Sequence, residues 1–123
     1  MNMWNNKMTG KDIVIGEIRE SDETGTIIFK SAQELFDFSK KIYNALLEIP
    51  EYKLEEKDKK AIEWLKIGLA DAERQIKGKG GMDEILSKKL IYTIKAVSDI
   101  FSQHKTFKNH QILDELYRHI KII

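Results

Sequence analysis

Residues 57–76 read KDKKAIEWLKIGLADAERQI and lead into the glycine-rich run Lys77-Gly78-Lys79-Gly80-Gly81. Apolar residues recur through this stretch at helical spacing and form one stripe. We expect a long helix here that stops at the glycines, because glycine adopts the left-handed conformation of a helix C-cap at little steric cost. An amphipathic helix needs cover on its apolar side, so this stretch predicts the centre of a small helical bundle. The stripe is Ala61, Leu65, Leu69, Ala72 and Ile76, with Ile62, Trp64 and Ile67 beside it.

Three other segments carry matching stripes. A helix is predicted from Ser31, which forms a capping box with Glu34, to Pro50, because the residue before proline avoids helical geometry. A third helix begins at Met82 or Asp83 and runs to about Phe101. A fourth follows the loop 103–108 and is capped by Asn109. The expected inward residues are Leu35, Phe38, Ile42, Ala45 and Ile49, with Phe36, Tyr43 and Leu47 beside them; Leu86, Leu90, Ile94, Val97 and Phe101, flanked by Ile85, Tyr92 and Ile100; and Ile112, Leu113, Leu116, Ile120 and Ile123, with Phe107 as an apolar plug.

A β-hairpin precedes the helices. The β-branched runs Asp12–Ile18 and Thr26–Phe29 flank a polar segment, Glu20–Gly25, that contains glycine and suits a turn. A lone hairpin is only marginally stable, so it must pack on the helices or pair with another chain through its free edge. The fold class is therefore α+β, mostly α, with an N-terminal β-hairpin followed by an antiparallel four-helix bundle. One domain spans 1–123, with a flexible N-terminus at 1–11, the hairpin at 12–30 and the bundle at 31–123.

Composition excludes several classes of protein. The chain has 123 residues, 41% hydrophobic and 33% charged, which indicates a globular protein with a charged surface. It has no cysteine, so disulfides, thiolate zinc sites and a cysteine nucleophile are excluded. No apolar run approaches the roughly 20 residues of a membrane-spanning helix, and the N-terminus lacks the apolar core of a signal peptide. We expect a cytoplasmic protein.

Charge is uneven along the chain although its formal net value is +1. Residues 1–58 hold 8 Lys or Arg against 12 Asp or Glu, and residues 59–123 hold 13 against 8. The two halves can steer a charged partner or neutralise each other in the folded state. Nucleic-acid binding is not expected, because a dedicated binder shows a larger basic excess with interleaved aromatic or arginine residues.

The glycine-rich run before the third helix has two interpretations. Backbone N–H groups beside a helix N-terminus can bind phosphate, with Lys77, Lys79, Lys88 and Lys89 as the alternative anion-binding residues. A P-loop, however, needs a glycine where Glu73 stands and Ser or Thr where Gly80 stands. A turn that ends one helix and starts the next is the favoured interpretation.

No motif for catalysis or for metal binding is present. Glu115 and His119 are four residues apart on one predicted helix face, which permits a divalent metal in principle, but no pair of histidines has a recognised zinc spacing. We expect surface histidines, no metal and no cofactor. No serine stands in a Gly-x-Ser-x-Gly elbow, and the chain is not expected to be an enzyme.

Two surfaces are candidates for binding. Trp64 can be an exposed anchor, although a core position is the favoured expectation. The C-terminal surface mixes cations with aromatic residues and suits an acidic protein or an anionic membrane surface, its alternative being an ordinary solvated helix end. Its binding residues are Lys105, Phe107, Lys108, Tyr117, Arg118 and Lys121.

A series of segments from residue 42 onward carries a family resemblance: Ile42-Tyr43-Asn44-Ala45-Leu46-Leu47 before a proline and an acidic linker, Trp64-Leu65 with Ala70, the lysine-glycine turn, Leu90-Ile91-Tyr92-Thr93-Ile94, Phe107-Lys108 and Leu113-Asp114-Glu115-Leu116-Tyr117. In these segments the chain resembles the immunity proteins that protect Gram-positive bacteria against their own pediocin-like bacteriocins. The resemblance covers about two-thirds of the chain. It implies an antiparallel four-helix bundle that acts without catalysis, recognises a membrane receptor already engaged by the toxin, and sets specificity with its C-terminal half, here Lys105, Lys108, Arg118 and Lys121. The hairpin departs from the family, which starts with a helix.

The sequence thus predicts a non-catalytic binding protein, a cytoplasmic immunity or antagonist protein that neutralises a toxin or a toxin-bound receptor. The first alternative is a phage or mobile-element inhibitor that occludes a host defence protein or sequesters a nucleotide signal, using the strand edge or a groove. The second is a pocket between two protomers that binds phosphates. The expected partner is another protein, with peripheral membrane contact and a homodimer through the hairpin edge as further options.

Overall fold

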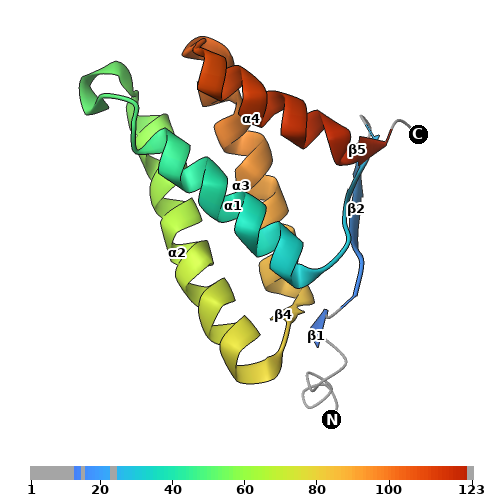
Figure 1. Ribbon diagram of the computed structural model, residues 1–123. Helices are drawn as coiled ribbons and strands as arrows, with labels where there is room; N and C mark the ends of the chain where they lie inside the picture. The colour runs from blue at the N-terminus through green and yellow to red at the C-terminus, as the bar shows by residue number, and fades with distance from the viewer. Residues whose placement is uncertain (1–12, 15, 23–24, 122–123) are drawn as a thin grey trace.

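The computed structural model describes residues 13–14, 16–22 and 25–121 and shows a mostly helical α+β protein (Figure 1). An antiparallel hairpin precedes four helices, as the sequence predicts. The predicted flexible terminus 1–11 and the predicted core residue Ile123 lie outside the described residues, as does the side chain of Ile120, another predicted core residue. The strands are β1 (Ile13–Val14), β2 (Ile18–Asp22), β3 (Gly25–Phe29), β4 (Met82–Asp83) and β5 (Ile120–Lys121), and the helices are α1 (Ala32–Leu46), α2 (Glu56–Lys79), α3 (Glu84–Gln103) and α4 (Phe107–Arg118), with a 3₁₀ turn at Glu51–Lys53.

The helix ends follow the local sequence, with three adjustments. Ser31 caps α1 by accepting from the N–H of Glu34 (3.1 Å), but the Glu34 carboxylate accepts from the N–H of Lys30 rather than from that of the cap residue. The first helix ends at Leu46 rather than running on to Pro50. The predicted glycine stop of α2 is confirmed at Gly80, whose φ is +81°, although the helix continues past Ile76 to Lys79.

The last helix begins earlier than predicted. Thr106, not Asn109, is its N-cap, because the Thr106 hydroxyl accepts from the N–H of Asn109 (3.1 Å). The side chain of Asn109 is buried, and its amide donates to the carbonyl oxygen of His104, the C-cap of α3. Asn109 therefore caps the C-terminal end of α3, and Thr106 caps the N-terminus of α4.

Most of the predicted inward stripes are confirmed as core. The exceptions are aromatic and aliphatic residues at the edges of the stripes. Phe107 is 77% exposed and plugs nothing, and the other exposed residues are Leu47, Trp64, Ile67, Ile85 and Tyr92. Ile49, Ala61, Ile76 and Leu113 are half-buried against the core. The confirmed core residues are Leu35, Phe38, Ile42, Ala45, Leu65, Leu69, Ala72, Leu86, Leu90, Ile94, Val97, Phe101, Ile112 and Leu116.

The hairpin has a different register from the predicted one. Residues 20–22 and Gly25, which the sequence assigns to the turn, lie in the paired strands β2 and β3. The Ile13-Val14 pair belongs instead to β1, which pairs with β4 next to the start of α3. The reason is tertiary, because a two-residue apolar strand can pair wherever a free backbone edge is offered, and the glycine turn after α2 offers one.

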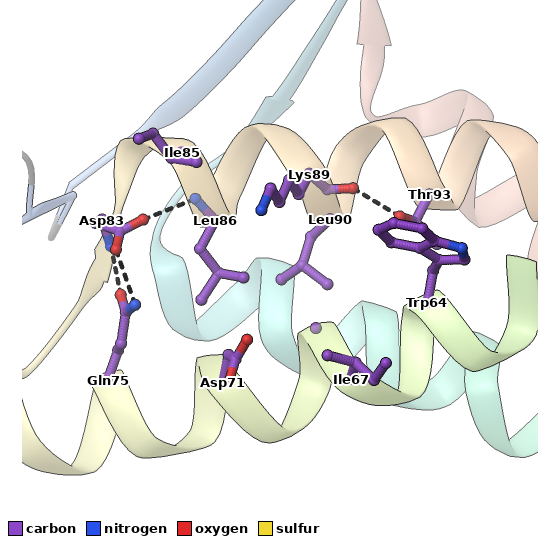
Figure 2. A pocket seen from close by; sticks show the side chains of 11 residues that line it. Trp64, Ile67, Asp71, Gln75, Asp83, Ile85, Leu86, Lys89, Leu90 and Thr93 are labelled. Carbon is purple, nitrogen blue, oxygen red and sulfur yellow. Dashed lines mark hydrogen bonds between the residues drawn. The ribbon is translucent and has the colours of Figure 1, made fainter.

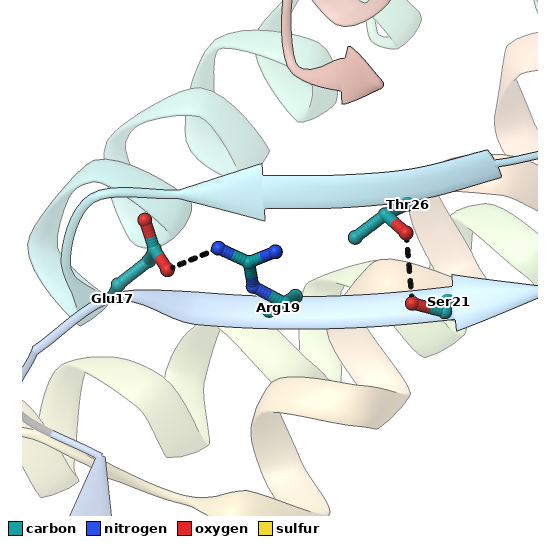
Figure 3. Close-up of polar contacts among 4 residues, drawn as sticks. All are labelled: Glu17, Arg19, Ser21 and Thr26. Carbon is teal, nitrogen blue, oxygen red and sulfur yellow. Dashed lines mark hydrogen bonds and ion pairs between the residues drawn. The ribbon is translucent and has the colours of Figure 1, made fainter. Parts of the chain in front are cut away.

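The sheet holds three strands in the order β2-β3-β5. The inner strand β3 is paired on both sides, so the free edge of the hairpin is β2, while β5 is the other outer strand of the sheet. This strand is polar: Arg19 pairs with Glu17 (2.9 Å), and Ser21 hydrogen bonds to Thr26 across the hairpin (2.8 Å; Figure 3). Charged residues on an edge strand disfavour its pairing with a strand of another chain. A homodimer through the hairpin therefore stays a prediction, and β2 is the strand that it would involve.

A cluster of three rings fixes the sheet to the helices. Phe29 of β3 is fully buried and stacks on His119, with ring centroids 4.3 Å apart, while Phe38 of α1 lies 5.9 Å from Phe29 and 5.4 Å from His119. The Nδ1 atom of His119 lies 3.0 Å from the carbonyl oxygen of Ile28. The second strand of the hairpin, β3, thus packs on the bundle, where it contacts α1 and the C-terminal end of α4.

We expect Ser39→Ala to raise the free energy of unfolding by about 1 kcal/mol. The Ser39 side chain on α1 is fully buried, and its hydroxyl has no hydrogen-bond partner among the described residues. A buried hydroxyl without a partner costs about 1–3 kcal/mol, and alanine is also the better helix former. Urea unfolding followed by circular dichroism measures the change. A loss of stability in the variant would show that the hydroxyl has a partner after all.

Candidate functional site

An uncovered groove runs between α2 and α3. α1 packs against both of these helices, and the groove opens on the side of the pair away from α1 (Figure 2). Trp64, Ile67 and Ile85 are 65%, 53% and 59% exposed around it. The groove is lined by Trp64, Ile67, Gly68, Asp71 and Gln75 of α2, by Asp83, and by Ile85, Leu86, Lys89, Leu90 and Thr93 of α3. We call this surface the α2–α3 groove.

The exposure of Trp64 corrects the sequence-based expectation that this tryptophan lies in the core. Its neighbour Leu65 is fully buried, so the core side of α2 is turned about 100° away from the indole. The indole reaches from α2 toward Thr93 of α3 and forms one end of the groove (Figure 2). The alternative interpretation of Trp64, an exposed aromatic residue, is the arrangement that the structure shows.

A glycine in the middle of α2 shapes the floor of the groove. A Cβ atom added to Gly68 would lie 3.0 Å from a terminal carbon of Leu90, closer than ordinary van der Waals contact. Glycine in a helix interior costs about 1 kcal/mol relative to alanine, so this position trades helix stability for a close approach of α2 and α3. Gly68 is not among the residues predicted from the sequence, although an isolated glycine in a helical pattern is the signal that marks such a position.

Hydrogen bonds hold the far end of the groove. Asp83 caps α3 by accepting from the N–H of Leu86 (2.7 Å), and its second oxygen accepts from the amide of Gln75 (2.9 Å). The Gln75 side-chain oxygen accepts in turn from the N–H of Asp83 (2.6 Å; Figure 2). These three bonds tie α2 to the start of α3 and fix the separation of the two helices at that end.

The charged side chains of the groove are not equivalent. The Asp71 carboxylate pairs with the guanidinium of Arg74, one turn further along α2. Both Asp83 carboxylate oxygens accept hydrogen bonds, one from the side chain of Gln75 and one from the N–H of Leu86. Lys89 is exposed, and its ammonium has no ion-pair partner among the described residues. The groove therefore offers an apolar hollow with one unpaired cation on its α3 side.

The predicted C-terminal binding residues fall into two groups rather than one face. Lys105, Phe107 and Lys108 are exposed at the start of α4, whereas Tyr117 and Arg118 are exposed about 15 Å further along its axis and about 80° round it. Lys108 is paired with Glu48 of the α1–α2 connection. Arg118 lines a shallow hollow with Glu17, Lys30 and Glu115. The Lys121 side chain lies outside the described residues.

The alternative anion-binding lysines do not converge on one point. Lys77 pairs with Glu73 (2.8 Å), and this ammonium holds the pKa of the Glu73 carboxyl below its usual value. Lys88 pairs with Glu84 (3.5 Å), Lys79 is exposed at the end of α2, and Lys89 lines the groove. Because Asp83 already caps α3, a carboxylate stands where a phosphate would bind the helix N-terminus. This arrangement disfavours the phosphate interpretation.

The histidines depart from the expectation of three surface residues. His119 is half-buried in the ring cluster with Phe29, while His110 lies 3.5 Å from Asp114 on the surface of α4. Glu115, the proposed metal partner of His119, instead pairs with Lys41 of α1 (2.8 Å). Within the described ranges, no three side chains of the His, Asp or Glu type lie close enough together to hold a metal ion.

Comparison with known proteins returned no match to a protein-family model, to a curated protein sequence or to a solved structure. Among the described helices, none has the length and apolar character that crossing a bilayer requires.

Proposed function

We propose that this protein acts by binding another protein through the α2–α3 groove, as an immunity or antagonist protein that neutralises a toxin, a toxin-bound receptor or a host defence protein. The observation that carries the proposal is the exposed apolar cluster of Trp64, Ile67 and Ile85 around a hollow. Aromatic and aliphatic residues gathered on a surface mark protein interfaces, and tryptophan is enriched among the residues that dominate binding energy.

The immunity assignment draws on the resemblance over residues 42–123, and the binding surface does not. In the resembling family the C-terminal half sets specificity, which points here to Lys105, Lys108 and Arg118, all of them exposed. The groove differs from that surface in one physical respect, because its apolar residues surround a hollow that a partner side chain can fill. Burying an apolar side chain of Leu or Phe size is worth about 1.5–3 kcal/mol.

Photo-crosslinking in cells tests the proposal. The chain is produced in a Gram-positive host with p-benzoylphenylalanine at position 64, and in parallel at positions 52 and 107. Position 52 is the matched control, because Tyr52 is 84% exposed and lies outside the groove. We expect one bacterial protein to be linked from position 64 and not from position 52, and mass spectrometry then identifies it.

The identity of the linked protein decides between the three partner classes. Its activity, whether toxicity, receptor function or defence against phage, is then measured with and without this chain, and we expect the chain to suppress it. Linkage from position 107 alone would move the interface to the C-terminal surface. Equal linkage from positions 64 and 52, or none from 64, would contradict binding through the groove.

A further inference from the structure

The α2–α3 groove is long enough to bind one short helix. Between Trp64 and Gln75 it runs about 16 Å along α2, the length of about three helical turns. On the opposite side of the same helix pair, α1 already occupies such a position, because it packs against both α2 and α3. An amphipathic helix that lies in such a groove anchors itself through residues at i, i+3 or i+4 and i+7.

The hollow inside the groove fits a side chain better than a small molecule. Its volume is about 200 Å³, below the roughly 300–1,000 Å³ typical of ligand pockets. Trp64 and Ile67 form its apolar walls on α2, with Leu86 and Leu90 opposite on α3 (Figure 2). One apolar side chain of leucine or phenylalanine size, entering from a neighbouring helix, suits this shape.

Charge selects among the helices that could enter. The carboxylate of Asp71 is neutralised by Arg74, and that of Asp83 accepts two hydrogen bonds from within the chain. Lys89 has no such partner in the described part of the chain and stands beside the hollow. A partner that covers this ammonium without pairing it incurs the desolvation penalty of an isolated charge, whereas a carboxylate on the partner compensates for it.

We infer that the occupant of the α2–α3 groove is an amphipathic helix of the partner protein that carries an acidic residue beside its apolar anchors, with Lys89 as the group that selects for it. This inference rests on the proposed function and adds the chemistry of the partner to it.

Three synthetic helical peptides of about 15 residues test the inference directly. All carry leucines at i, i+4 and i+7, and they differ only in the residues that flank this stripe, which are glutamate, glutamine or lysine. Binding is followed by the fluorescence of Trp64 in a Trp4→Phe background, where it is the one remaining tryptophan of the two. Lys89→Glu is the charge-reversal variant. Lys66→Glu is the matched control, since Lys66 is exposed on α2 but outside the groove.

We expect the glutamate peptide to bind about threefold more tightly than the glutamine peptide, because a partly exposed ion pair adds modestly to affinity, and the lysine peptide to bind least. Lys89→Glu should reverse this order, and Lys66→Glu should leave it unchanged. The preference should weaken as salt concentration rises, because a partly exposed ion pair is screened.

Equal affinity for the three peptides, an unchanged order in Lys89→Glu, or no binding by any peptide would each overturn the inference. Crosslinking from position 64 distinguishes these failures from a failure of the proposed function. If a partner protein is linked there but no peptide binds, the proposal of protein binding through the groove stands and only the inference of an acidic helix is rejected. A concentration-dependent dimer that Trp64→Ala abolishes would assign the groove to a second copy of the chain and overturn the inference as well.

Discussion

Phe29→Ala is expected to lower the free energy of unfolding by about 3–5 kcal/mol, the range for removing a large aromatic side chain from a packed core. Phe29 is fully buried and touches two rings from different elements, Phe38 of α1 and His119 at the end of α4. Its loss leaves a cavity and removes ring contacts worth about 0.5–1.5 kcal/mol per pair beyond burial. A domain of this size typically has a stability of 5–15 kcal/mol, so the effect is a large share of the total.

Urea unfolding, followed by circular dichroism in the helical band, measures this loss. Phe107→Ala is the matched control: it removes the same ring from a 77% exposed position and should change stability by less than about 0.5 kcal/mol. If the two variants lose similar amounts, the hairpin does not depend on Phe29 for its attachment to the helices. A loss confined to Phe29→Ala supports the sheet as an integral part of the core.

Trp64→Ala is expected to raise the Kd for the crosslinked partner by about 30-fold or more. Truncation of a tryptophan that anchors an interface typically costs about 2 kcal/mol or more, and each 1.4 kcal/mol is a factor of ten in Kd. The same variant should change the free energy of unfolding by no more than about 1 kcal/mol, because the indole is mostly exposed in the free protein. Calorimetry of the purified pair gives the Kd, and urea unfolding gives the stability.

Tyr52→Ala controls for the removal of an exposed aromatic residue outside the groove and should leave the Kd within about twofold of the parent value. Phe107→Ala and Tyr117→Ala report on the C-terminal surface that the family resemblance implies. A strong effect of these two with none from Trp64→Ala would transfer the interface from the groove to α4.

The helices and their core stripes could be read from the chain because helical periodicity is a local property. Leu65, Leu69 and Ala72 follow a spacing that is visible in sequence and lie in the core as predicted. The prediction for Phe107 is wrong for a matching reason: the residue is apolar and stands at a helix end, but the elements in the described part of the chain leave its ring exposed. Periodicity indicates which face of a helix is apolar, and it does not indicate how far around that face the neighbouring helices extend.

The candidate groove was only half visible in the sequence. The sequence offers Trp64 as an interface anchor and places Ile67 and Ile85 beside the stripes, but no local pattern indicates that the three surround a common hollow. The pair Gly68 and Leu90 decides this, since the close approach of α2 and α3 at this point sets the shape of the floor. Such an approach depends on residues 22 positions apart, which no short-range pattern records.

Local chemistry alone determined the order of elements, the glycine stop of α2, the serine cap of α1 and most of the core, because capping, turns and amphipathicity act within a few residues. Packing decided the rest. The pairing of β1 with β4, the addition of β5 to β3 and the stacking of His119 on Phe29 all join segments distant in the chain. The exposure of Trp64 depends likewise on which face of α2 the neighbouring helices cover. Their free energy comes from surfaces that exist only once the helices have met, and so the face that this protein offers to a partner is a property of its tertiary structure.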